Sequence, residues 1–84
     1  MKIEYRRQAE KYLHRCDANT RNKIFRAIEG LKEQKGDVRP IEGSDMYRLK
    51  IEHFRIAFTY DIKSDSIIIE AILPRGDFYK YIGR

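Results

Sequence analysis

The spacing of apolar residues changes once along this chain of 84 residues, from a helical repeat to a strand repeat. From about residue 8 to residue 35, apolar side chains recur three and four positions apart, which lines one face of a helix. From residue 47 onward they alternate with polar side chains or form a short unbroken run, as they do in half-buried and fully buried strands. We therefore expect helices followed by a sheet, an α+β fold.

The helical segment divides into two helices. The first apolar stripe consists of Ala9, Tyr12, Leu13 and Cys16, and the second of Ile24, Ala27, Ile28 and Leu31. Asp17 and Asn19 interrupt the pattern and favour the start of a new helix, because their side chains can cap it. Gly36 stands where a helix ending near residue 35 needs a left-handed residue. So short a connection predicts an antiparallel helical hairpin.

Four strands are predicted around this hairpin. Residues 2–5 form the first. Residues 47–51 alternate strictly, the large apolar residues of 54–60 also alternate, and the apolar run 67–73 is typical of a strand covered on both faces. Residues 36–45 are predicted as a loop, and residues 75–84, after Pro74, as a polar and aromatic tail. The predicted order is β-α-α-β-β-β, a helical hairpin packed on a mainly antiparallel twisted sheet in a single domain of residues 1–84.

Several classes of protein are excluded by composition. The longest apolar run, at Ile67–Ile69, is far below the roughly 20 residues of a membrane-spanning helix, and no signal-peptide segment follows the charged amino terminus. We therefore expect a cytoplasmic protein without a membrane span. Cys16 is the single cysteine and reads as an apolar helix residue, and His14 and His53 are the two histidines. No zinc-ligand spacing occurs, so neither a metal nor another cofactor is expected.

Basic residues gather on one face of the predicted sheet. If Glu52 and His53 form a two-residue turn, Lys50 lies directly opposite Arg55, and both share a face with Arg48. A longer loop would shift this register, whereas Arg48 and Lys50 share a face in any unbulged strand. Like charges at cross-strand distance destabilise a sheet, and no acid interrupts these three. The pattern therefore indicates a surface that binds phosphate.

Such a surface suits cleavage of RNA by its own 2′-hydroxyl. Attack on the adjacent phosphorus builds extra negative charge, which fixed guanidinium groups stabilise more strongly in the transition state than in the substrate. Repulsion from the neighbouring arginines disfavours the charged form of Lys50, and only an uncharged amine can act as a general base. Lys50 is therefore the candidate base.

These motifs together resemble a known family. The segments Tyr47-Arg48-Leu49-Lys50-Ile51, Phe54-Arg55-Ile56 and Arg75-Gly76-Asp77-Phe78-Tyr79 are similar to those of the RelE/ParE toxin superfamily of type II toxin–antitoxin pairs, RelE-like branch. The resemblance covers nearly the whole chain and implies the fold predicted above. It also implies a ribosome-dependent messenger RNA endoribonuclease that cleaves without metal and inhibits translation and growth.

The resemblance assigns roles to five residues. It implies Lys50 as base, with Arg48 and Arg55 on the scissile phosphate. Arg75 would stabilise the phosphate or protonate the leaving group, and Tyr79 would stack on or orient a splayed base. The implied partners are the ribosome, messenger RNA and an acidic RelB-like antitoxin that forms a hetero-oligomer with the toxin.

Two other functions stay open. A ParE-like poison of DNA gyrase shares the strand motif, and an inactive toxin could serve only as an antitoxin-binding module. The net charge of +5 does not decide between them, because residues 1–42 hold 11 basic and 7 acidic side chains and the remainder 7 and 6. Most of the excess belongs to the helical half, where it favours docking on a polyanion or an acidic partner rather than catalysis.

Overall fold

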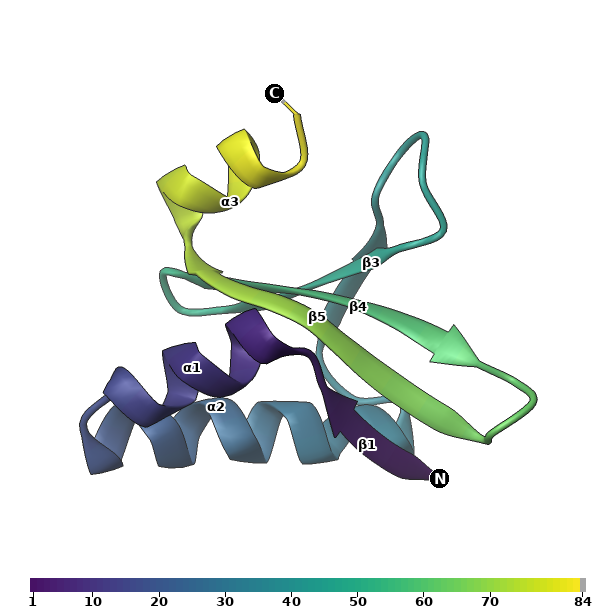
Figure 1. Ribbon diagram of the computed structural model, residues 1–84, viewed down its shortest axis with the longest axis horizontal. Helices are drawn as coiled ribbons and strands as arrows, with labels where there is room; N and C mark the ends of the chain where they lie inside the picture. The colour runs from purple at the N-terminus through teal and green to yellow at the C-terminus, as the bar shows by residue number, and fades with distance from the viewer. Residues whose placement is uncertain (84) are drawn as a thin grey trace.

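The computed structural model describes residues 1–83 and contains one five-stranded sheet, ordered β1-β5-β4-β3-β2 (Figure 1). Its strands are β1 (Lys2–Tyr5), β2 (Asp37–Pro40), β3 (Tyr47–Ile51), β4 (Phe54–Asp61) and β5 (Ser66–Pro74). β1 pairs in parallel with β5, and the other neighbours are antiparallel. The predicted mainly antiparallel sheet is therefore confirmed.

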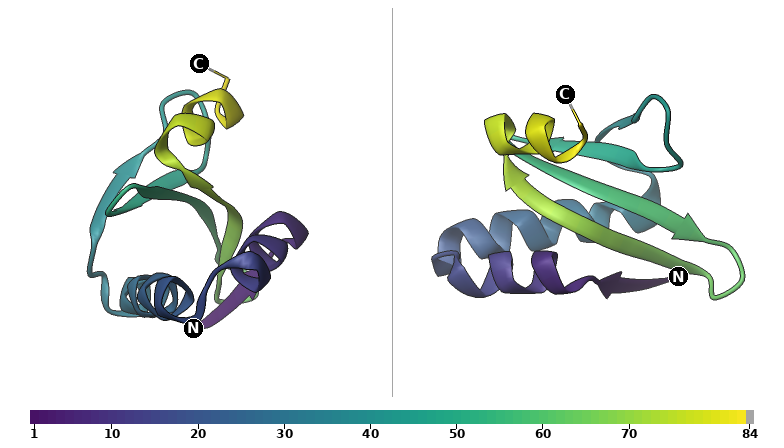
Figure 2. Two further views of the ribbon diagram at one scale, coloured as in Figure 1. Left: turned by 90° about the vertical axis from the view of Figure 1, so that its left-hand side faces the viewer. Right: turned by 45° about the horizontal axis from the view of Figure 1, so that its top comes forward.

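Two helices, α1 (Arg7–Arg15) and α2 (Ala18–Gly30), form the predicted hairpin and lie on one side of the sheet (Figure 2). The Asp17 side chain caps α2 by accepting a hydrogen bond from the Thr20 backbone N–H at 3.2 Å. α2 ends five residues before the predicted end, and a 3-10 turn, Leu31–Glu33, follows it. The left-handed residue that ends this turn is Gln34, with φ 58°, ahead of Gly36. Within residues 1–83, no helix is long and apolar enough to cross a membrane.

The hydrophobic core lies between the helices and the sheet. α1 and α2 contribute the predicted stripe residues Ala9, Leu13, Ile24 and Ile28, all buried. β3, β4 and β5 contribute alternate residues on their helix side, as the strand period predicts, with one step of three in β5 where its register with β4 shifts opposite Ala57 and Phe58. These core residues are Leu49, Ile56, Phe58, Ile67, Ile69 and Ile72. Because one face of each element is apolar, burial against the other layer holds the two layers together.

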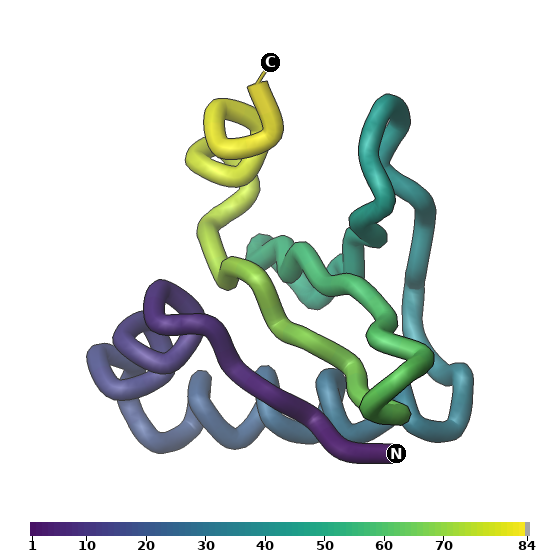
Figure 3. The backbone as a smooth tube through the Cα atoms, turned by 45° about the vertical axis from the view of Figure 1, so that its right-hand side comes forward, coloured from purple at the N-terminus to yellow at the C-terminus, as the bar shows by residue number. Residues whose placement is uncertain are grey.

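A third helix, α3 (Arg75–Tyr81), stands on the opposite side of the sheet, as does the loop between β2 and β3 (Figure 3). α3 contacts β4 and β5, and its Phe78 is 1% exposed. Ala57 and Ala71 pair across β4 and β5 and are fully buried. Small residues at this point leave room for an aromatic side chain on the face that α3 covers. Phe78 thereby anchors α3.

The structure corrects three predictions. The segment 36–45 contains the strand β2, whose four residues have too little pattern to outweigh the turn signals of Gly36 and Pro40. The tail contains α3, whose seven residues include one buried side chain and so lack a helical stripe. The strand formed by the run 67–73 is not covered on both faces along its whole length. Ile68 and Glu70 lie outside the part of the sheet that α3 covers, and they are only partly buried.

Candidate active site

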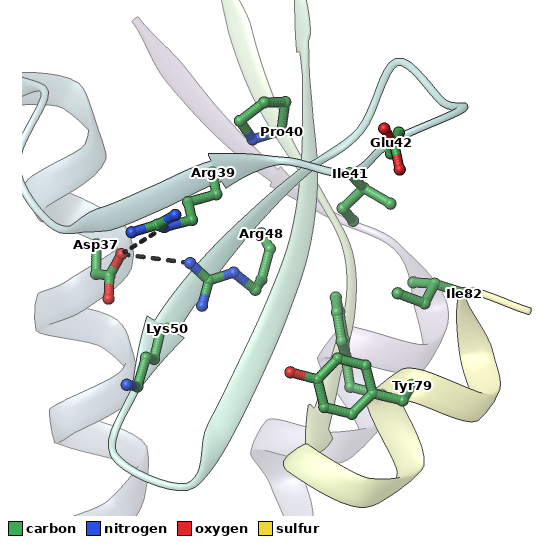
Figure 4. A pocket seen from close by; sticks show the side chains of 10 residues that line it. Asp37, Arg39, Pro40, Ile41, Glu42, Arg48, Lys50, Tyr79 and Ile82 are labelled. Atoms are coloured by element: carbon green, nitrogen blue, oxygen red, sulfur yellow. Dashed lines mark hydrogen bonds and ion pairs between the residues drawn. The ribbon is translucent and has the colours of Figure 1, made fainter. Parts of the chain in front are cut away.

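The sheet face turned away from α1 and α2, here called the open face, carries Arg48 and Lys50 of β3 together with their strand partners. A pocket of about 570 Å³ lies on it, between β2, β3, the loop after β2, and α3 (Figure 4). Arg48, Lys50 and Tyr79 all line this pocket. Three of the five predicted site residues therefore meet around one space.

The predicted register of β3 and β4 is confirmed. Ile51 pairs with Phe54 and Lys50 with Arg55, so Glu52 and His53 form a two-residue turn. Glu52 takes the left-handed conformation there, with φ 52°. The turn also ties down α3, because the Arg75 N–H donates to the His53 carbonyl at 2.8 Å. Lys50 and Arg55 thus lie side by side on the open face, as the repulsion argument requires.

Arg55 lies on this face but is buried, with 5% of its surface exposed. One guanidinium nitrogen, Nη1, donates to the carbonyls of Glu52 and Phe54, both at 2.9 Å, while the buried Nε has no hydrogen-bond partner. Within residues 1–83, no acidic side chain forms an ion pair with Arg55. Burial of a charge without an opposite charge is costly, and the strand fixes this charge in place. Arg55 therefore supplies a rigid positive potential beneath the pocket.

Arg48 is not free of acids, which corrects the prediction of an uninterrupted basic face. Its Nη2 donates to the Asp37 carboxylate at 3.3 Å, and Arg48 keeps 15% of its side chain exposed. Asp37 lies on β2 directly opposite Lys50, and Arg39 lies opposite Arg48. The sequence analysis missed both β2 residues because it assigned them to a loop. Their available signal was the polar-apolar-polar order of Asp37, Val38 and Arg39.

Arg75 is the first residue of α3, and Tyr79 lies one turn later on the same side of the helix. The Arg75 guanidinium carbon is 5.8 Å from the Tyr79 ring centre, a cation–π contact. Tyr79 is 41% exposed, and its hydroxyl points toward the side of the pocket that holds Arg48 and Lys50 (Figure 4). Hydrogen bonding by Arg75 lowers the pKa of Tyr79, and Arg55 acts in the same direction. Tyr79 thus contacts Arg75, feels the charge of Arg55, and lines the same pocket as Arg48 and Lys50.

The pocket can therefore hold an anion and offer it several donors of different acidity. Arg48 and Lys50 present positive charge on the strand side, and Tyr79 presents a hydroxyl and an exposed ring on the helix side. Residues 1–83 contain no group of three or more His, Cys, Asp or Glu side chains that could hold a metal ion. The chemistry that these residues offer is charge stabilisation and proton transfer by side chains.

Comparison with known proteins identifies the family. The family model described as ParE toxin of type II toxin-antitoxin system, parDE, matches residues 3–79. No curated protein matches the sequence. Among solved structures, the chain is similar to one in the RelB-RelE antitoxin-toxin complex from Methanococcus jannaschii, with 24% identity and a TM-score of 0.73 over 93% of this chain and 96% of that one.

Two further structures show the same fold. A chain of the archaeal RelE-RelB complex from Pyrococcus horikoshii OT3 is 26% identical, with a TM-score of 0.69 over 89% of this chain and 94% of that one. The YoeB/ParE toxin from Agrobacterium tumefaciens is 15% identical, with a TM-score of 0.74 over 88% of this chain and 98% of that one. The resemblance seen in the strand motifs is thereby confirmed, and the protein belongs to the ParE family of type II toxins, within the RelE/ParE superfamily.

Proposed function

We propose that this toxin is an endoribonuclease that cleaves messenger RNA on the ribosome, by metal-independent attack of a 2′-hydroxyl on the scissile phosphate. One observation carries the proposal: strand β3 and helix α3 place Arg48, Lys50 and a tyrosine of lowered pKa around one pocket on the open face, and Arg55 of β4 pairs with Lys50 beside it. The site residues are Arg48, Lys50, Arg55, Arg75 and Tyr79. The active unit is residues 1–84 as a single domain.

The cations are proposed to stabilise the transition state. Attack on phosphorus gives a pentacoordinate state with more negative charge than the substrate, and positive groups held in place need no rearrangement to meet it. Arg48 contacts the phosphate from the pocket wall, and the buried Arg55 adds its charge from below. A guanidinium fixed by two carbonyl hydrogen bonds suits this role because its position is set before substrate binds.

Lys50 and Tyr79 are proposed to handle the protons. Lys50, exposed and directly opposite Arg55, accepts the proton of the 2′-hydroxyl. The leaving 5′-oxygen needs a proton on the other side of the phosphorus, and α3 stands on that side of the pocket. A lowered pKa makes the Tyr79 hydroxyl a better donor than an ordinary tyrosine, with Arg75 stabilising the phenolate that results. The exposed Tyr79 ring can also stack on the neighbouring base.

The proposed partners follow from the relatives and the charge. Two of the similar structures are complexes with antitoxins, so we expect an acidic antitoxin to bind this chain in a hetero-oligomer. The excess positive charge of residues 1–42 suits docking on ribosomal RNA. Both partners would place the protein in the cytoplasm.

A second candidate is a poison of DNA gyrase. The observation that favours it is the matching family model, whose description names the ParE toxin. The ion pair between Arg48 and Asp37 also removes part of the free charge that a nuclease site would use. A gyrase poison would break DNA and leave RNA intact, and an inactive antitoxin-binding module would do neither.

Inducible expression in a bacterial host separates the three functions. We expect the parent to arrest growth and to cut messenger RNA, and Lys50→Ala to lose the cutting while the protein stays folded, because Lys50 is exposed. Lys50→Arg should fail as well, since an arginine stays protonated and cannot act as a base. Growth arrest with DNA breaks and intact messenger RNA would instead support the gyrase poison. Cutting that continues at parental rate in both variants would show that Lys50 is not the base.

A further inference from the structure

Strands β2 and β3 arrange four charged side chains of the open face as a square. Arg39 lies opposite Arg48, and Asp37 lies opposite Lys50. Asp37 sits within reach of both arginines: its Oδ1 is 3.3 Å from Arg48 Nη2 and 4.0 Å from Arg39 Nε. All four residues line the pocket of the candidate active site (Figure 4). The square therefore holds three cations around one carboxylate.

The Asp37 carboxylate makes the contacts that a phosphate would make. Carboxylate and phosphate oxygens both accept charge-assisted hydrogen bonds from guanidinium groups, in the same geometry. Arg48 Nη2 can therefore donate a hydrogen bond to either anion, and Arg39 lies close enough to contact the same anion. A phosphate that entered beside an undisplaced Asp37 would meet a like charge at short distance, so the two anions exclude each other.

Asp37 is also free to move. Its side chain is 52% exposed, and among residues 1–83 its carboxylate pairs with the two arginines only. Exposed ion pairs of this kind hold their partners weakly, so a bound phosphate can displace the carboxylate at small cost. Arg39 is 78% exposed and can follow the ligand.

We propose that the RNA phosphate contacted by Arg48 binds in the place of the Asp37 carboxylate and reaches Arg39 as well. Asp37 is then an internal counter-charge that the substrate must displace, and it sets the affinity of the pocket for the RNA backbone. Arg39 becomes a further binding residue of the site. This inference rests on the proposed RNA-cleaving function and adds to it a residue that weakens substrate binding.

Loss of the Asp37 charge should tighten RNA binding. A unit charge at about 4 Å contributes about fivefold in affinity even at the dielectric constant of water. Removing it also leaves one more cation to neutralise phosphate, so the slope of log affinity against log salt should steepen by about 0.7 for a single strand. Asp37→Asn keeps an oxygen that can accept from Arg48, whereas Asp37→Ala removes it; both lose the charge.

The test measures binding of an RNA oligonucleotide with 2′-O-methyl groups, which lacks the attacking hydroxyl, to the full chain over a salt series. We expect both Asp37 variants to bind about fivefold tighter than the parent at low salt, and Arg39→Gln to bind more weakly. Glu33→Gln is the matched control, because Glu33 also pairs with one basic side chain, Lys35 at 3.1 Å, but does not line the pocket. Its affinity should stay near the parental value.

The outcomes separate this inference from the function on which it rests. If the parent binds and cleaves RNA but the Asp37 variants match Glu33→Gln or bind more weakly, the inference fails and the function stands. If neither parent nor variants bind the oligonucleotide, the inference fails, and the proposed function is judged separately from cleavage of messenger RNA on the ribosome. If the Asp37 variants gain affinity for poly-L-glutamate but not for the oligonucleotide, the displaced carboxylate marks a site for an acidic protein segment and not for RNA.

Discussion

Replacement of Arg55 by methionine tests whether the buried arginine serves function or stability. Its guanidinium makes two hydrogen bonds to carbonyls, each worth about 1.5–3 kcal/mol when the donor is charged. Two costs oppose these hydrogen bonds. Desolvation of a buried cation that has no acidic partner costs several kcal/mol, and the unpaired Nε costs about 1–3 kcal/mol. Repulsion by Lys50 across the strand pair adds to the cost.

These contributions nearly cancel, and methionine fills the space without a charge. The free energy of unfolding of Arg55→Met should therefore lie within about 1 kcal/mol of the parental value. Cleavage of ribosome-bound messenger RNA should fall about 100-fold or more, the usual cost of removing one group that stabilises the transition state. Stability is read from urea unfolding and cleavage from initial rates.

Arg21→Met is the matched control with the opposite expectation. Arg21 also donates to backbone carbonyls, those of Leu13 at 2.8 Å and Cys16 at 2.6 Å, but it lies between α1 and α2, away from the pocket. This variant should lose about 1–3 kcal/mol of stability and keep its cleavage rate. The reasoning on Arg55 is refuted if Arg55→Met loses more than about 3 kcal/mol of stability, or if it cleaves as fast as the parent.

Three further predictions concern stability and titration. Gln34→Gly should raise the free energy of unfolding by about 0.5–1 kcal/mol, because a left-handed φ of 58° strains any side chain, and unchanged urea unfolding would contradict it. Phe78→Ala should lower the free energy of unfolding by about 3–5 kcal/mol and speed hydrogen exchange in α3, and Phe78→Leu should lower it by less. Equal protection of α3 from exchange in the parent and both variants would show that Phe78 does not anchor the helix. On raising pH, Tyr79 should ionise before Tyr5, Tyr12 and Tyr81, since burial raises the pKa of those three tyrosines whereas Arg75 lowers that of Tyr79. The pKa of Tyr79 is lower in the folded protein than in the unfolded chain, so ionised Tyr79 stabilises the folded state. This contribution is present above about pH 10 and is lost as pH falls through the folded-state pKa. Arg75→Gln should remove the early phase of phenolate absorbance, and an unchanged first phase would contradict the assignment.

Sequence patterns predicted the parts of this fold that repeat. The stripes of α1 and α2 and the alternation of β3 and β4 each extend over enough residues to define a face, and the register followed once Glu52 and His53 formed the turn. β2 and α3 are too short for such a pattern. Each is held by contacts with distant residues: β2 by pairing with β3, and α3 by burial of Phe78.

The candidate site divides in the same way. Arg48 and Lys50 share a face because the strand period requires it, and this much is local. The Asp37 partner of Arg48 comes from another strand, and the burial of Arg55 depends on how the turn and the neighbouring elements cover it, so neither is visible in the spacing of residues 47–60. Local spacing consequently predicts the cations but not the acid that accompanies them.

The ends of the RNA fragments test the central proposal most directly. Ribosomes carrying messenger RNA are treated with the purified toxin, and the fragment ends are identified. Attack by the 2′-hydroxyl without metal predicts a 2′,3′-cyclic phosphate on one fragment and a 5′-hydroxyl on the other, with both absent for Lys50→Ala. Fragments with 3′-hydroxyl and 5′-phosphate ends, or intact messenger RNA from an active toxin, would contradict the account.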